Sequence, residues 1–124
     1  MKTDELTIGE AKELAKMFGG GSQYRVDNGM IGKYVIVRCH DAGVHAGFLK
    51  DYNGRECLLD KGRRLWVWKP ANNALTLSAV ATEGLDESSK VGAPVTIHLT
   101  ENCEIMECTD RAAKSIQEVK NYVR

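Results

Sequence analysis

The 124-residue sequence has no excess charge of either sign, because 17 Lys and Arg side chains are matched by 17 Asp and Glu side chains. A general nucleic-acid-binding domain is usually strongly basic, so this balance argues against that class and leaves room only for a local basic patch. The chain also lacks an apolar signal sequence and any apolar run long enough to span a bilayer. We therefore expect one cytoplasmic domain, residues 1–124, with no membrane partner.

The cysteines lack the spacing of the usual zinc motifs. The four cysteines are Cys39, Cys57, Cys103 and Cys108. No two form a C-x-x-C pair and no Cys/His spacing is typical of zinc, so free, partly buried thiols are the simplest interpretation. Spacing alone also assembles no nucleophile with its base and orienting group. We expect no metal, no cofactor and no catalytic residue, and we rank binding above catalysis.

The centre of the chain has the short apolar runs and the Gly, Asn and Asp turns of a β-meander. Four strands are predicted, at residues 33–40, 44–51, 55–59 and 63–69. Turns are predicted at 41–43, 53–54 and 60–62, and the Asn-Gly pair at 53–54 is the strongest hairpin signal in the sequence. Gly47, inside the second strand, predicts a bend or a bulge.

Two helices are predicted on either side of this meander. The first, within residues 1–21, begins with a capping box, carries a narrow apolar stripe and ends at three glycines. The second, residues 72–83, would be capped by Asn72 or Asn73 and would end at Gly84.

The last third of the chain returns to the sheet. A polar connection at 85–92 leads to a strand with clear alternation at 95–99. After a kink at 101–102, this strand is predicted to continue over residues 103–107. Thr109 then caps a final helix, predicted to span 109–124.

This order of elements predicts an α+β protein that is mainly β. A curled antiparallel sheet of about five strands usually closes into a small barrel. We expect an SH3-like or Sm-like barrel over residues 32–108, with the helix 72–83 inserted in it and helices at both ends, 1–21 and 109–124. The inserted helix and the long tail depart from the Sm pattern.

Several pieces of the chain together resemble a family of short, uncharacterised bacteriophage proteins. They are IGKYVIVR at 31–38, AGVHAG at 42–47, RRLWVW at 63–68 and the return strand from Leu99 to Thr109. The resemblance covers most of the chain except the N-terminal helix and brings no catalytic residues. It implies a small accessory protein in the cytoplasm of an infected bacterium. Such proteins often bind and disable a host component, and some sequester the nucleotide signals of bacterial immunity.

The strand at 63–69 carries the strongest candidate for a binding site. Alternation places Arg64, Trp66 and Trp68 on one face, with Arg63 beside them in sequence. Arginine binds phosphate through two parallel hydrogen bonds, and an indole stacks on a nucleobase with about 1–3 kcal/mol per base. The alternative is equally weighted: the tryptophans are buried under the final helix or lie in an oligomer interface, where Trp and Arg are also enriched.

His45 is the fifth candidate, because it lies between small residues that would let a ligand approach closely. We slightly favour the alternative, in which the turn needs its glycines and the histidine is satisfied internally.

The leading hypothesis for function is a phage accessory protein that binds, and sequesters, a small nucleotide-derived ligand. The competing hypotheses are an Sm-like or SH3-like module that binds single-stranded nucleic acid or a host protein, and a structural oligomer. We also expect a homo-oligomer, because the short helix at 8–18 needs a docking surface, the net charge is zero, and tryptophans that faced outward would need a partner.

Overall fold

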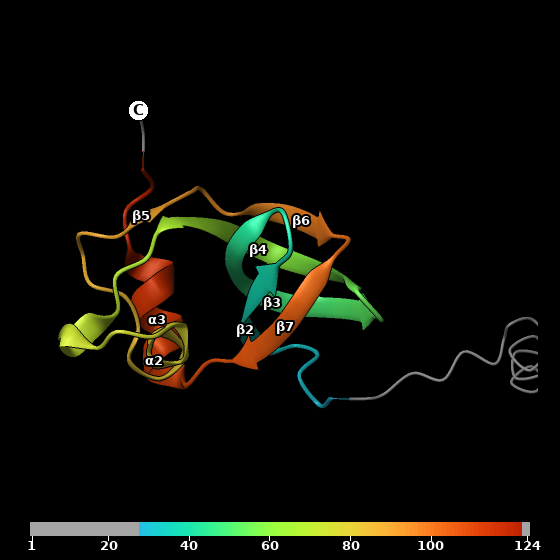
Figure 1. Cartoon of the computed structure of the whole chain (residues 1–124), viewed down its shortest axis with the longest axis horizontal. Coiled ribbons are helices and arrows are strands. Elements are labelled where there is room, and N and C mark those ends of the chain that lie inside the picture. The colour runs from blue at the N-terminus through green and yellow to red at the C-terminus, as the bar shows by residue number, and fades with distance from the viewer. Residues whose placement is uncertain (1–27, 123–124) are drawn as a thin grey trace, which may run out of the picture.

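The computed structural model describes residues 28–122, so the predicted N-terminal helix at 1–21 lies outside the described part of the chain. The elements are β2 (Tyr34–Cys39), β3 (Gly43–Asn53), β4 (Glu56–Val67), the 3₁₀ turn η1 (Ala71–Asn73), α2 (Leu77–Glu83), β5 (Lys90–Val91), β6 (Val95–Leu99), β7 (Asn102–Glu107) and α3 (Asp110–Glu118) (Figure 1). The protein is therefore mainly β, with two α-helices in its described part.

The six strands form one antiparallel sheet. Its order is β5-β4-β3-β2-β7, and β6 pairs with β4 off this path. The consecutive strands β6 and β7 pair with opposite sides of the β2–β3–β4 meander. β6 pairs with β4, and β7, which follows after two residues, pairs with β2. Within residues 28–122 no ladder joins β6 to β7, so the sheet is not closed.

The predicted pair of strands at 55–59 and 63–69 is wrong, because both belong to one strand, β4. Lys61, at the centre of the expected turn, has a φ of 54° and forms a bulge instead. The ladder with β3 continues across it, pairing Phe48 with Asp60 and Ala46 with Arg63. Residues 60–62, the site of a predicted turn, therefore form a bend inside β4, and β4 stays paired with β3 and β6 across it.

Two glycines let the bent strands approach each other closely. The irregularity predicted at Gly47 is present, because the β3–β4 ladder shifts register between Ala46 and Phe48. A Cβ on Gly47 would lie 2.8 Å from the Gly62 Cα and 3.1 Å from the Asp60 carbonyl oxygen. A Cβ on Gly62 would lie 2.9 Å from the Ile97 Cδ1 atom in β6. Any larger residue at 47 would push against backbone, so this crossing needs glycine.

The inserted helix is shorter than predicted. Residues 72–83 divide into η1 and α2, and α2 begins after Thr76, whose Oγ1 accepts a hydrogen bond from the Ala79 N–H at 3.2 Å. Asn72 and Asn73 do not cap it, because both have a positive φ, 58° and 60°, in the turn before it. Gly84 ends the helix as expected, with a φ of 94°.

The final helix also ends early, at Glu118 rather than at residue 124. The chain then runs in extended form, and the Tyr122 N–H donates to the Val91 carbonyl oxygen at 2.8 Å. Val91 belongs to β5, which lies in the stretch 85–92 that we expected to be a polar connection. A strand therefore replaces part of the predicted loop, and extended chain replaces part of the predicted helix.

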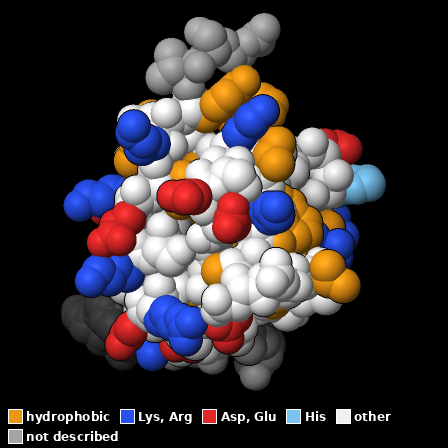
Figure 2. Space-filling view, turned by 90° about the vertical axis from the view of Figure 1, so that its left-hand side faces the viewer, with side chains coloured by type: hydrophobic (Ala, Val, Ile, Leu, Met, Phe, Trp, Pro, Cys, Tyr) orange, Lys and Arg blue, Asp and Glu red, His pale blue; other side chains and the backbone are white. Residues whose placement is uncertain are grey.

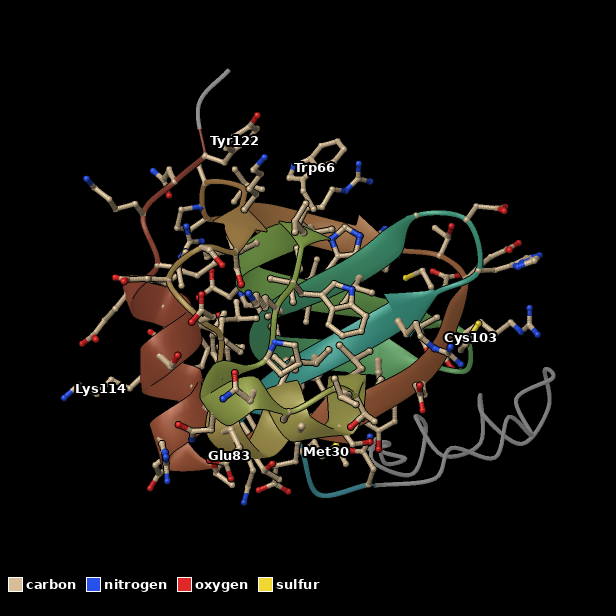
Figure 3. The ribbon with its side chains drawn as sticks, turned by 60° about the vertical axis from the view of Figure 1, so that its left-hand side comes forward. Met30, Trp66, Glu83, Cys103, Lys114 and Tyr122 are labelled. Carbon is tan, nitrogen blue, oxygen red and sulfur yellow. The ribbon has the colours of Figure 1, made fainter. Side chains whose placement is uncertain are left out.

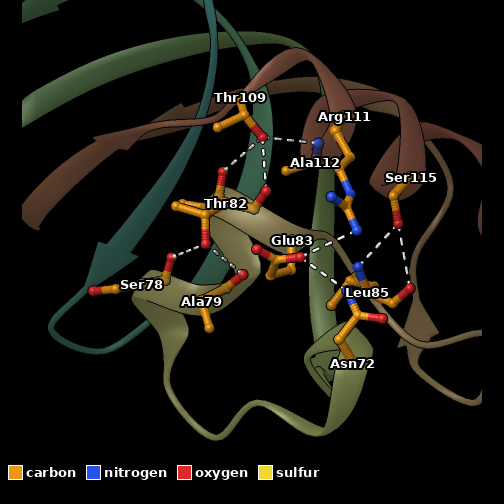
Figure 4. A network of polar contacts seen from close by, with 11 residues as sticks. Asn72, Ser78, Ala79, Thr82, Glu83, Leu85, Thr109, Arg111, Ala112 and Ser115 are labelled. Atoms are coloured by element: carbon orange, nitrogen blue, oxygen red, sulfur yellow. Dashed lines mark hydrogen bonds and ion pairs between the residues drawn. The ribbon is translucent and has the colours of Figure 1, made fainter.

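A network of polar contacts joins α2 to α3 (Figure 4). The Thr109 hydroxyl accepts from the Ala112 N–H at 3.1 Å, which confirms the predicted cap, and donates to the Thr82 carbonyl oxygen at 2.9 Å. The Glu83 carboxylate pairs with the Arg111 guanidinium at 3.2 Å. These contacts fix the two helices against each other at one end of the sheet (Figure 1).

The buried residues form two clusters, one on each face of β2. Val35 and Val37 belong to a cluster made of strand residues and therefore lie between the strands of the bent sheet. Tyr34 and Ile36 belong to the helix-side cluster, which we define as the buried residues that pack the sheet against α2 and α3, including Ile116. Neither α-helix described in residues 28–122 has the length and apolar character needed to cross a membrane.

Candidate functional site

Arg64 and Trp66 lie together near the end of β4, as the alternation predicts. The Trp66 side chain is 60% exposed and projects from the molecule (Figure 3). The Arg64 guanidinium carbon lies over its ring, 5.1 Å from the centroid. This distance is that of a cation–π contact, so the arginine holds one face of an exposed indole.

The Ala42 carbonyl oxygen connects Arg64 to His45. The Arg64 Nη2 group donates to it at 3.2 Å and the His45 Nε2 group lies 2.9 Å from it. His45 and Arg64 are also direct partners in the β3–β4 ladder. The turn that ends at Gly43 thus positions Arg64, and Gly43 itself has a φ of 84°. The remaining N–H groups of Arg64 have no acceptor among the described residues.

His45 is a support for this site rather than part of its surface, because it is only 3% exposed. A carbonyl oxygen only accepts, so Nε2 carries the proton and Nδ1 is an acceptor; Nδ1 is buried without a partner in the described chain. Burial lowers the pKa of His45, the Ala42 hydrogen bond opposes this change, and the Arg64 charge reinforces it. The imidazole is therefore neutral at pH 7.

Arg63 serves the fold, because it is 2% exposed and bonded internally. Its Nε donates to the Gly92 carbonyl oxygen at 2.8 Å, and its Nη1 donates to the Ile116 and Gln117 carbonyl oxygens at 2.8 and 3.4 Å. Its Nη2 donates to Asn121 Oδ1 at 2.8 Å. A cation at the carboxyl end of α3 is also favoured by the helix dipole. We therefore leave Arg63 out of the candidate surface.

Trp68 lies with the core rather than beside Trp66. The ladder between β4 and β5 shifts register between Leu65 and Val67, so the regular alternation of faces ends there. Trp68 is half-buried and packs against the helix-side cluster, to which Leu65 belongs. Val67, which alternation assigns to the core face, is 49% exposed. The predicted common face of residues 64, 66 and 68 therefore holds only for the first two.

The structure adds two residues that the sequence analysis missed. Lys90 pairs with Val67 across the β4–β5 ladder, and its Nζ lies 5.2 Å from the centroid of the Tyr122 ring. Tyr122 is 44% exposed. We call Arg64, Trp66, Val67, Lys90 and Tyr122 the aromatic surface. Its second half escaped notice because β5 looked like a polar loop and residue 122 like part of a helix.

Cavities of the described chain are lined by neither Arg64 nor Trp66, although one of about 590 Å³ is lined by Tyr122. Another cavity, of about 620 Å³, lies between β2 and α3, and its wall includes Lys33, Glu107 and Tyr34. Lys33 and Glu107 form an ion pair at 3.3 Å, and acidic and basic side chains are interspersed over the face that carries the helices (Figure 2). Because this wall carries both acidic and basic side chains, it favours neither an anionic nor a cationic ligand. The Tyr34 hydroxyl is buried with no hydrogen-bond partner in residues 28–122, and burial raises its pKa.

The four cysteines are free. In the part of the chain that the structure describes, no group of three or more His, Cys, Asp or Glu side chains is placed to hold a metal ion.

A family model described as a domain of unknown function (DUF6948) matches residues 32–116. The match begins just before β2 and ends in α3, so it includes the whole sheet and both halves of the β4 strand. No curated protein and no solved structure matches the chain.

Proposed function

The chain belongs to the DUF6948 family, and we propose that it binds a small nucleotide-derived ligand at Arg64 and Trp66 and sequesters it. The observation that carries this proposal is the exposed Trp66 indole held on one face by the Arg64 guanidinium. In line with the resemblance to short bacteriophage proteins, we place this activity in the cytoplasm of an infected bacterium.

The chemistry of the pair suits a nucleotide. The face of the indole away from Arg64 can stack on a base, which contributes about 1–3 kcal/mol. Arg64 uses one donor on Ala42, and its other N–H groups can bind a phosphate oxygen. Because the His45 Nε2–H group donates its hydrogen bond to the Ala42 carbonyl oxygen and the ring is buried, His45 supplies no acid or base at this surface, which favours binding over catalysis.

An SH3-like or Sm-like barrel remains our proposal for the finer fold. It is supported by the return strand, whose two halves pair with β4 and β2, the strands on either side of β3. In such a barrel, Arg64 and Trp66 would lie at one end, beside the β2–β3 turn, whose Ala42 carbonyl oxygen accepts a hydrogen bond from Arg64.

A protein interface is the second candidate, and the exposure of Trp66 and Val67 favours it. Trp and Arg dominate the binding energy of many interfaces, so Trp66 and Arg64 would anchor a second copy of the chain or a host protein. This candidate includes the homo-oligomer that we expect from the sequence.

Calorimetry of the full-length protein with mononucleotides, cyclic nucleotides and ADP-ribose-type nucleotides tests the proposal. Trp66→Ala should weaken binding about 5- to 150-fold, which corresponds to the loss of one stacked base. Arg64→Ala should also weaken it, while Lys69→Ala, at an exposed cation just beyond β4, should leave it unchanged.

Light scattering and thermal melts of the same variants separate the two candidates. If no nucleotide binds, and Trp66→Ala instead lowers the molar mass of the particle, the surface is an oligomer interface and the proposal is wrong. Unchanged nucleotide affinity in both Trp66→Ala and Arg64→Ala would also exclude it.

A further inference from the structure

The aromatic surface contains a second cation–ring pair that the proposed function does not use. Lys90 lies over the Tyr122 ring at 5.2 Å, as Arg64 lies over Trp66 at 5.1 Å. Two such pairs are more than a single base requires.

The two rings lie on segments that flank β5, one on each side of it. Val67 in β4 pairs with Lys90 in β5, and Val91 in β5 forms a bridge with Asn121 on its other side. Paired strands are about 4.8 Å apart, so the backbones that carry Trp66 and Tyr122 are separated by roughly 10 Å, with Lys90 between them. Both rings project from the same side of the molecule (Figure 3).

We propose that Tyr122 and Lys90 form a second subsite, and that the ligand of this surface is a dinucleotide: two bases joined through phosphate. This inference rests on the proposed function, since it takes Trp66 as the first stacking site. One base stacks on Trp66, the other stacks on Tyr122, and the phosphate linkage lies over Lys90, between the rings.

The surroundings of Tyr122 fit this assignment. Tyr122 lines a cavity of about 590 Å³, a volume within the usual range for small-molecule sites. The wall of that cavity also includes Glu87, Glu118 and Lys120, so its two carboxylates outnumber its one ammonium group and disfavour a phosphate group there. The base therefore occupies the cavity side of the ring, and the phosphate lies on the side of Lys90.

The affinity ratio between the dinucleotide adenylyl-(3′→5′)-adenosine and AMP tests the inference. A second stacked base should make the dinucleotide bind about 5- to 150-fold more tightly than AMP. Tyr122→Ala should bring this ratio close to one, and Tyr122→Phe, which keeps the ring, should preserve it. Lys90→Gln should lower the ratio only in part, because the phosphate linkage loses its cation while the ring remains. Leu75→Ala, at an exposed apolar side chain outside the aromatic surface, should leave the ratio as it is.

The outcomes separate the two proposals. If AMP binds in a Trp66-dependent manner but the dinucleotide binds no more tightly, the second subsite is wrong and the proposed function stands. If neither compound nor any other nucleotide of the panel binds, both proposals fail. A ten-nucleotide oligoadenylate that binds far more tightly than the dinucleotide, with a steep dependence on salt, would show that single-stranded nucleic acid is the ligand instead.

Discussion

Replacing Arg63 by methionine should destabilise the protein far more than the same change at Arg64, its neighbour in sequence. Methionine keeps an apolar stem of similar length but removes the four hydrogen bonds to Gly92, Ile116, Gln117 and Asn121. Each bond from a charged donor contributes about 1.5–3 kcal/mol, but bonds that share one guanidinium are not additive. Each buried acceptor left without a donor costs about 1–3 kcal/mol, and because these costs do not simply add we expect a total loss of about 3–5 kcal/mol.

Urea unfolding followed by circular dichroism measures this difference. A loss of about 3–5 kcal/mol would lower Tm by roughly 10–20 °C in a domain of this size. Arg64→Met removes one hydrogen bond and a contact with an exposed ring, so its loss should stay below about 1 kcal/mol. Equal losses in the two variants, or a loss below about 1 kcal/mol for Arg63→Met, would refute the structural role of Arg63.

Two further changes test the positions of His45 and Gly47. Because burial lowers the pKa of His45 below its ordinary value of 6.5, the unfolded chain takes up the proton first, so the free energy of unfolding should fall as pH drops from 7.5 through 6.5. Urea titrations at several pH values should show a shallower fall for His45→Gln than for the exposed control His40→Gln, and identical slopes would contradict the buried, neutral imidazole. Gly47→Ala should lower stability by about 1–3 kcal/mol, because the new Cβ meets backbone at 2.8 Å, while Gly92→Ala, whose nearest contact is 3.7 Å, should be tolerated. Equal melting temperatures of these two glycine variants would rule out the close crossing of β3 and β4.

Features that depend on a few adjacent residues were predictable from the sequence. The Asn53-Gly54 hairpin, the Thr109 cap and the alternating strand at 95–99 each rest on local geometry, and the structure confirms all three. The shared face of Arg64 and Trp66 follows from the same strand period.

Features that depend on partners distant in sequence were not predictable. Arg63 and Arg64 are indistinguishable as a pair of letters, yet one is bonded to residues 29 to 58 positions away and the other lies over an exposed indole. Trp68 does not lie on the predicted face, because the β4–β5 ladder shifts register between Leu65 and Val67. β5, whose pairing with β4 contains this shift, has only two residues. No local pattern in a polar stretch identifies so short a strand.

The bulge at Lys61 explains why the aromatic surface exists at all. If residues 60–62 formed a turn, as their composition suggests, the chain would reverse there and residues 63–69 would begin a new strand beside 55–59. Instead β4 continues, pairs with β6 as far as Gly62 and with β5 from Leu65, and carries Arg64 and Trp66 to the side of the molecule that carries Tyr122 (Figure 3). Arg63, at the first position after the bend, then bonds the segment that brings Tyr122 alongside. The same strand that supplies the first cation–ring pair thus also bonds the segment that carries the second. A change at Arg63 should therefore weaken the proposed subsite at Tyr122 before it affects Trp66, which the dinucleotide-to-AMP affinity ratio of Arg63→Met would measure.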